Sequence, residues 1–169
     1  MAICVSILTV SDRSNRGERA DLSGPALRSA VEQQGWQIID TAIVPDESGQ
    51  ISRTLADWAD SGKSDLILTT GGTGFTGRDV TPEATLAIIE RQTPGIIQAI
   101  LIESLKITPH AMLSRAVSGI RAHTLIVNFP GSPKAAVENL NIILPVLPHA
   151  IDLLHESPAA EAGHQKSSR

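Results

Sequence analysis

Glycine residues gather in one short segment, where they would let main-chain N–H groups surround an anion. Gly71, Gly72 and Gly74 follow a short apolar run, and Thr73 lies between them. Without side chains at three positions, the main chain could wrap a phosphate, and a helix expected to begin at Thr81 would add its N-terminal dipole. The segment therefore favours a phosphate-binding loop. A tight turn that needs positive φ angles explains the same glycines, so this alternative stays open.

Asp46 and Asp79 are the aspartates best placed to bind a metal ion. Each lies in a predicted loop just after a strand, and neither has an obvious role in capping a helix. Mg²⁺ in proteins binds one or two carboxylates and completes its shell with water and substrate phosphates. We therefore expect the two side chains to converge on one Mg²⁺. The alternative is that both are ordinary solvated loop residues.

Polar or glycine residues also follow the other predicted strands. Ligands of open parallel sheets bind at the carboxyl ends of the strands, so these loops are further candidates for the site. The candidates after the first and the last parallel strand are Ser11, Asp12, Pro130, Gly131 and Ser132.

Two further groups of side chains could contact an anionic or polar substrate. Arg13, Arg16 and Arg19 form either an anion clamp or a self-paired loop, because acidic residues alternate with them. Ser114 and Arg115 offer a hydroxyl and a guanidinium to a polar substrate head, although from the residues alone surface packing is the better explanation.

Several familiar motifs are absent or misplaced. Residues 72–77 satisfy G-x-G-x-x-G, but they follow the third strand instead of the first, which argues against a dinucleotide-dependent oxidoreductase. The lysine and hydroxyl residue of a Walker loop are missing after Gly77, and there is no G-x-S-x-G elbow or paired-histidine metal motif.

Composition narrows the function classes further. The chain of 169 residues has a formal charge of −4 and only 2% aromatic residues, so we expect no nucleic-acid partner. Cys4 is the only cysteine, which suits a reducing compartment. No apolar run is long enough to span a membrane and the N-terminus does not resemble a signal peptide, so the sequence predicts a cytoplasmic protein without membrane contact.

The apolar pattern alternates between strand-length runs and helical spacing. Strands are expected near residues 3–10, 38–44, 66–70 and 124–127, with a short antiparallel strand within 116–120. Helical spacing lies between them, first over residues 24–34. Thr or Ser followed by Pro at positions 81, 93, 108 and 132 predicts N-caps of later segments. We therefore expect an α/β fold with a mostly parallel sheet, spanning residues 1–155, and a disordered tail over residues 156–169.

One long motif and several short ones resemble the molybdopterin-binding MoaB/Mog family. The long motif is TTGGTGFTGRDVTPEAT at residues 69–85. The short ones are TVSD at 9–12, IVPDE at 43–47, MLSR at 112–115, NFPGSPK at 128–134 and LPHAIDLL at 147–154. They run in order from about residue 3 to 155.

This resemblance implies a three-layer α/β/α fold and a molybdopterin adenylyltransferase. Such an enzyme uses ATP, molybdopterin and Mg²⁺ to make adenylated molybdopterin and pyrophosphate, and its product serves molybdate insertion. By similarity, Asp46 and Asp79 are the essential acidic pair, residues 71–74 and 130–133 border nucleotide and pterin, and Ser114 falls in the pterin-binding segment. A homotrimer is also implied, for which the wide apolar stripe after Pro94 would serve. The alternative is a carrier that holds molybdopterin without adenylating it.

Overall fold

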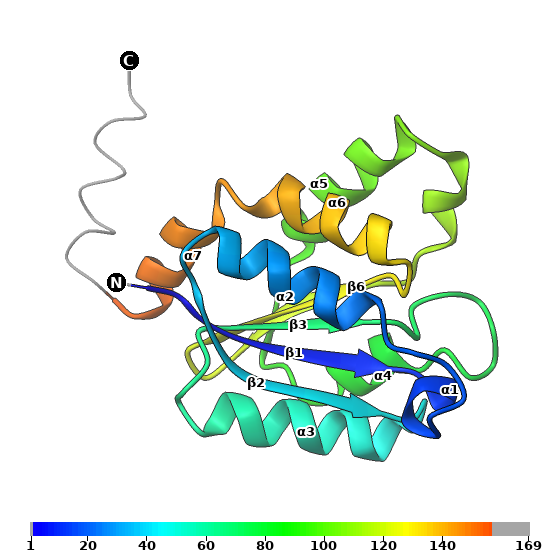
Figure 1. Ribbon diagram of the computed structural model, residues 1–169. Coiled ribbons are helices and arrows are strands. Elements are labelled where there is room, and N and C mark those ends of the chain that lie inside the picture. Colours follow the sequence, from blue (N-terminus) through cyan, green and yellow to red (C-terminus); the bar gives the residue numbers. More distant parts are fainter. Residues whose placement is uncertain (1, 157–169) are drawn as a thin grey trace.

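A six-stranded sheet runs through the middle of the computed structural model, which describes residues 2–156 (Figure 1). The first four strands in the spatial order are parallel, and the last two are antiparallel to their neighbours. The predicted α/β fold with a mostly parallel sheet is confirmed. The spatial order is β2 (Gln37–Val44), β1 (Cys4–Val10), β3 (Leu66–Thr70), β6 (Thr124–Phe129), β5 (Ser118–Arg121) and β4 (Arg91–Gln92).

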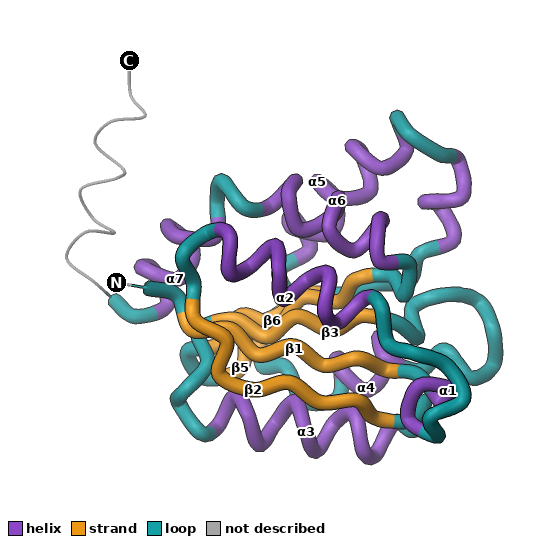
Figure 2. The backbone as a smooth tube through the Cα atoms, in the orientation of Figure 1, coloured by secondary structure: helices purple, strands orange, loops and turns teal. Residues whose placement is uncertain are grey.

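Helices cover both faces of the sheet, so the expected three layers are present (Figure 2). One face carries α2 (Ser23–Gln33), α5 (Pro94–Leu105), α6 (Pro133–Ile143) and α7 (Leu147–Leu154). The other carries α3 (Ser48–Asp60) and α4 (Thr81–Leu86). Both faces of the central strands are therefore buried, which is why these strands read as continuous apolar runs.

Strand β1 shows how the period-two geometry divides its side chains between the two layers. Val5 and Ile7 belong to the larger core cluster, whereas Leu8 and Val10 belong to the smaller one. Successive side chains of a strand point to opposite faces, so this alternation fixes the register of the sheet against both helical layers. The fixed register in turn fixes where each strand ends and its loop begins.

The four Thr/Ser-Pro dipeptides do not all cap helices as predicted. Thr108 and Ser132 do so, since their hydroxyls accept main-chain N–H groups of the next turn. At Thr81 the prediction is wrong, because Val80 occupies the N-cap and the Thr81 hydroxyl donates to the Gly71 carbonyl over 2.9 Å. Thr93 occupies an N-cap position, but its hydroxyl bonds to a serine of β5.

The described part of the chain ends at Glu156, two residues after the end of α7. Of the predicted tail over residues 156–169, only Glu156 lies within the described residues, so the tail and the domain boundary stay predictions. No single described helix is long and apolar enough to cross a membrane, and α6 and α7 reach that length only as a pair bent by 67°.

We expect Asn128→Ala to destabilise the fold strongly. The buried Asn128 amide donates to the hydroxyls of Thr69 and Thr85 over 3.0 Å each, and its oxygen accepts from the Val117 N–H. Truncation removes three hydrogen bonds and leaves a cavity at a fully buried position, although the Thr85 hydroxyl keeps its bond to the Thr81 carbonyl. The free energy of unfolding should therefore fall by about 2–4 kcal/mol in urea titrations. Asn141→Ala, an exposed change on α6, is the control and should cost less than about 0.5 kcal/mol. Equal effects of both changes would contradict the prediction.

Candidate active site

The loops after the four parallel strands meet at one edge of the sheet and enclose a cavity of about 230 Å³. Each strand end contributes to its lining: Ser11 after β1, Asp46 after β2, Gly71 after β3 and Gly131 after β6. Between β1 and β3 the chain order of the sheet reverses, which is where open α/β sheets bind ligands. We call this hollow the acidic cavity, because Asp79 lines it together with Asp46.

The two candidate metal ligands are therefore brought together, although they are far apart in the sequence. Asp46 Oδ2 accepts the Asp12 N–H over 2.7 Å. Asp79 Oδ2 accepts both the N–H and the hydroxyl of Thr76, each over 2.8 Å. Within residues 2–156 the Oδ1 atoms of both aspartates receive no hydrogen bond. One oxygen of each carboxylate is thus held by the protein, and the other has no hydrogen-bond partner among the described residues.

Asp12, which the sequence also singled out, supports this pair. Its Oδ1 accepts the Asp46 N–H over 3.0 Å, so the two aspartates exchange hydrogen bonds between main chain and side chain. The Arg78 guanidinium donates two bonds, of 3.0 and 2.8 Å, to the Asp12 carboxylate and lowers its pKa. Because its charge is already paired, Asp12 is poorly placed to serve as a third metal ligand. Among the described residues, no group of three or more acidic, histidine or cysteine side chains has metal-binding geometry.

The electrostatics of Asp46 favour a cation in the acidic cavity. Burial raises the pKa of Asp46, and the negative charges of Asp12 and Asp79 raise it further. The hydrogen bond from the Asp12 N–H and the positive charge of Arg78 lower this pKa, but the net shift is upward. Desolvation and like charges both disfavour the ionised carboxylate. A divalent cation between the two carboxylates would remove this cost. Two carboxylates with free oxygens are also the number that Mg²⁺ takes when phosphates complete its shell.

The glycine loop after β3 adopts a tight turn that requires glycine at two positions. Gly71 and Gly72 have φ angles of +101° and +64°. A Cβ atom at Gly71 would lie 2.2 Å from the Val10 carbonyl oxygen, and one at Gly72 would lie 2.4 Å from Thr81 Oγ1 and 3.2 Å from Asp46 Oδ1. The turn explanation is thus correct, and phosphate binding by the same loop stays a prediction. The Thr81 N–H donates to the Gly72 carbonyl, so this amide is not available to a phosphate.

A second cavity, of about 300 Å³, lies on the other side of the same loops. Its apolar walls come mainly from α5 and the 3₁₀ helix η1 (Pro109–Leu113), whereas α6 adds Ala135 and the polar Glu138 and Asn139. We call it the apolar cavity. Thr73, Gly74 and Pro130 line it, whereas their neighbours Gly71 and Gly131 line the acidic cavity. The glycine loop and the loop after β6 therefore form a wall shared by both cavities.

The remaining predicted site residues are distributed between these hollows and their walls. Ser114 lines the apolar cavity, as expected for a residue that contacts an organic substrate. Arg115 lines neither of these two cavities but a third, open hollow that it shares with Asp79, and its guanidinium bonds to the Gly74 and Asp79 carbonyls and to Glu83 of α4. Ser11 caps the short helix α1 (Asp12–Asn15) and lines the acidic cavity, whereas Ser132 caps α6 and lines neither cavity.

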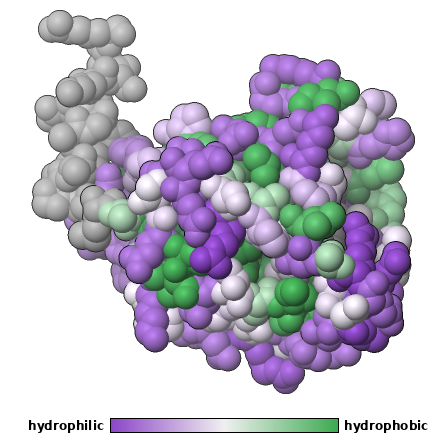
Figure 3. Space-filling view, viewed as in Figure 1, coloured by the Kyte–Doolittle hydropathy of each residue, from purple (hydrophilic) through white to green (hydrophobic). Residues whose placement is uncertain are grey.

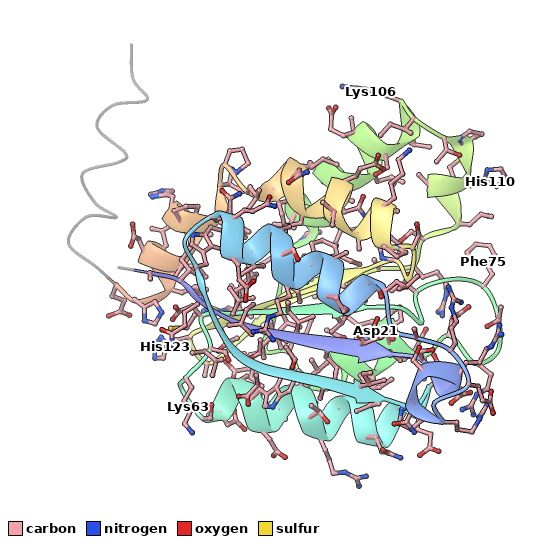
Figure 4. The ribbon with its side chains drawn as sticks, in the orientation of Figure 1. Asp21, Lys63, Phe75, Lys106, His110 and His123 are labelled. Carbon is pink, nitrogen blue, oxygen red and sulfur yellow. The ribbon has the colours of Figure 1, made fainter. Side chains whose placement is uncertain are left out.

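Several residues that line the acidic cavity were not among the predicted site residues, and Thr9 and Asp21 are the two whose side chains pair with each other. Asp21 accepts the Thr9 hydroxyl over 2.7 Å and joins the start of α2 to the end of β1 (Figure 4). A hydroxyl near the end of an otherwise apolar strand is the signal that could have identified Thr9. In the arginine segment, Arg16 pairs with Glu18, as the self-paired alternative expected, but Arg19 reaches the cavity.

Known proteins resemble this chain over nearly all of its length. A family model described as a probable molybdopterin binding domain matches residues 6–149. Molybdopterin adenylyltransferase from Helicobacter pylori strain J99 is 38% identical over 90% of this chain and 88% of that protein. The crystal structure of the molybdopterin biosynthesis enzyme MoaB from Thermus thermophilus is 47% identical, covers 92% of this chain and 98% of the other, and superposes with a TM-score of 0.87.

Larger proteins contain the same domain. Gephyrin from Dictyostelium discoideum is 45% identical over 98% of this chain, and the molybdenum cofactor synthesis protein cinnamon from Drosophila melanogaster is 44% identical over 90%. The chain spans only about a quarter of the length of each, 24% and 26%. The match to the family model covers well over half of the sequence and the fold agrees with a solved member, so this chain belongs to the molybdopterin-binding domain family.

Proposed function

We propose that this chain acts in molybdenum cofactor biosynthesis as a molybdopterin adenylyltransferase. It would transfer AMP from ATP to molybdopterin and release pyrophosphate. The observation that carries the proposal is the pair of adjoining cavities with a shared wall, one acidic and one apolar. Such an arrangement suits a reaction between a nucleoside triphosphate, bound with a cation in the acidic cavity, and an organic substrate in the apolar cavity. Relatives named molybdopterin adenylyltransferase, which match this chain over most of their own length, support the same activity.

Asp46 and Asp79 would hold a Mg²⁺ ion, since each presents an oxygen that no described group occupies. Bound Mg²⁺ reduces the repulsion between the anionic phosphate that attacks and the α-phosphoryl group of ATP. The protein itself supplies no nucleophile in this scheme. Its residues position the two substrates and compensate charge, which is the main requirement of phosphoryl transfer.

The main chain around the glycine loop would contact the phosphates of ATP. Gly71, Gly72 and Gly131 bring bare backbone to the acidic cavity. The Gly71 N–H already donates to the Phe129 carbonyl over 3.1 Å, so the amides of Gly72 and Gly131 are the ones that would bind phosphate. Arg19 adds a guanidinium to the same lining. Peptide N–H groups and an arginine are suited to binding phosphate oxygens.

Molybdopterin would bind in the apolar cavity, where its ring system finds apolar walls. Ser114 offers a hydroxyl there, and Thr73 and Pro130 lie on the shared wall toward the acidic cavity. This placement would direct the phosphate of molybdopterin toward the α-phosphate of ATP. We further propose a cytoplasmic location and transfer of the adenylated product to a molybdate-insertion protein.

Removal of either metal-binding carboxylate should abolish turnover without loss of pterin binding. Incubation with ATP, Mg²⁺ and molybdopterin should give adenylated product, detected by mass, and pyrophosphate. Asp46→Ala and Asp79→Ala should each lower the rate about 100-fold or more, because one ligand of the metal is lost, whereas molybdopterin affinity should stay within about twofold. EDTA should stop the parent enzyme, and added Mg²⁺ should restore it.

The matched control is Asp57→Ala, which removes an exposed aspartate from α3. Its rate should equal that of the parent. A parent protein that binds molybdopterin but releases no pyrophosphate in the presence of ATP and Mg²⁺ would be a carrier, and the proposed activity would be wrong.

We also propose that the chain forms a homotrimer through the outer surface of α5 and η1. Ile102 of α5 and Met112 of η1 are 58% and 63% exposed there, and exposed apolar side chains of this size are suited to an interface. Figure 3 shows green apolar groups among purple polar ones on the face of the molecule in view. Ile102→Glu should therefore yield a smaller species in sedimentation velocity experiments, with the fold retained by circular dichroism. Arg53→Glu on the exposed side of α3 is the control and should leave the trimer intact. A parent chain that sediments as a monomer would disprove the trimer.

A further inference from the structure

Arg115 connects the apolar cavity to the metal-binding side of the site. It follows Ser114, which lines the apolar cavity, and its own N–H donates to the Thr73 carbonyl over 2.9 Å. Its side chain is about one-third exposed and points to the segment that contains Asp79. The sequence suggested that this guanidinium binds substrate, but its contacts in the structure indicate a different role.

The guanidinium joins the two ends of the loop formed by residues 74–79. Arg115 Nε donates to the Gly74 carbonyl over 2.7 Å, and Nη2 donates to the Asp79 carbonyl over 2.6 Å. These carbonyls lie five positions apart in the chain. A planar guanidinium fixes the relative position of two acceptors better than a flexible ammonium group does.

The loop is in turn closed onto the Asp79 carboxylate. Thr76 donates its N–H and its hydroxyl to Asp79 Oδ2, and the Asp79 N–H donates to the Thr76 carbonyl over 3.0 Å. A Cβ atom at Gly74 would lie 3.0 Å from the same Oδ2. Asp79 is therefore held through its carbonyl by Arg115 and through its carboxylate by Thr76. Loss of the first contact would loosen the second, because both act on one short loop.

The charge of the guanidinium is already compensated. Arg115 Nη1 pairs with the carboxylate of Glu83 in the first turn of α4, and this contact lowers the pKa of Glu83. A cation that is paired with a neighbouring carboxylate attracts a substrate anion less strongly than a free one. Arg115 thus resembles a structural clamp more than a site for an anion.

We propose that Arg115 is a positioning residue, which orients Asp79 and the loop of residues 74–79 for catalysis and does not bind substrate. The inference rests on the proposed adenylyl transfer.

Arg121 provides a matched control, because its guanidinium makes the same kinds of contact elsewhere. It donates to both carboxylate oxygens of Asp60 over 2.8 and 2.7 Å and to the Ile88 carbonyl over 2.8 Å. It lines neither the acidic nor the apolar cavity. Arg121→Ala therefore removes an equivalent ion pair and a main-chain contact without touching the loop of residues 74–79.

The kinetic test separates positioning from substrate binding. Arg115→Ala should lower kcat about 10- to 100-fold, the effect of lost hydrogen bonds to a charged group, and leave KM for ATP and molybdopterin within about twofold. Millimolar guanidinium should restore part of kcat, and Arg115→Lys should retain an intermediate rate. Arg121→Ala should match the parent. A raised KM for either substrate with kcat preserved would overturn the inference.

A second substitution predicts opposite signs for the two roles. Glu83→Gln removes the charge of the carboxylate that pairs with the Arg115 guanidinium. If Arg115 is a positioning residue, kcat should therefore fall while KM stays unchanged. If Arg115 bound a substrate anion, release from Glu83 would lower KM instead, and the inference would be wrong.

Hydrogen exchange provides a readout that does not depend on activity. The Thr76 and Asp79 amides should exchange at least about tenfold faster in Arg115→Ala than in the parent or in Arg121→Ala, because the loop is released. Unchanged exchange together with unchanged kcat in an active parent would overturn the inference alone. A parent without adenylyl transfer would overturn the proposed function, and faster exchange in Arg115→Ala would still support the clamp.

Discussion

The placement of the carboxylates of Asp46 and Asp79 in one hollow is the constraint on which the rest of the site depends. Both line one cavity of about 230 Å³, and burial raises the pKa of Asp46. Two like charges in a poorly solvated hollow are unfavourable unless a cation joins them or rigid contacts hold them. The protein supplies the contacts, through the Asp12 N–H for one carboxylate and through Thr76 for the other. In the proposed reaction, a divalent cation bound with ATP would compensate the remaining charge of the pair.

The architecture of the sheet makes this arrangement possible. β1, β2, β3 and β6 are parallel neighbours, so their carboxyl ends and the loops that follow them lie along one edge. Because these loops approach one another closely, two positions of the loop after β3 have no room for a side chain. Any side chain at Gly71 would meet the Val10 carbonyl, and one at Gly72 would meet Thr81 and approach Asp46. The glycines are thus required by the packing of the loops as well as being suitable for phosphate.

Periodicity and turn residues were enough to predict most of the fold. The four parallel strands, the short antiparallel strand and the helices between them follow from apolar spacing, because both faces of the sheet are buried. The pairing of Asp46 with Asp79 could be predicted from their positions after strands. β4 has only two exposed residues, Arg91 and Gln92, and no apolar pattern marks it. Thr81 illustrates another limit, since its hydroxyl serves a distant carbonyl in preference to its own helix.

Side-chain partners across the site could not be predicted, because they depend on how loops from different strands meet. The pairing of Arg78 with Asp12 spans 66 positions, and Arg115 contacts Glu83 over 32. Local spacing carries no information on such pairs. For the same reason, the sequence suggested that Ser114 and Arg115 contact one substrate together. In the structure, Ser114 lines the apolar cavity, whereas the Arg115 guanidinium bonds to the carbonyls of Gly74 and Asp79.

The shared wall between the cavities explains why one short segment carries so many of the family's motif residues. Gly71 and Gly72 face the acidic cavity, Thr73 and Gly74 face the apolar one, and Asp79 closes the loop that follows. A displacement of this wall changes both cavities at once, so neither substrate site can be altered independently of the other. A reaction between two anionic substrates needs such coupling, because the attacking phosphate and the α-phosphoryl group must be aligned against their repulsion. In the proposed reaction, the segment that contacts both substrates would therefore also orient one toward the other.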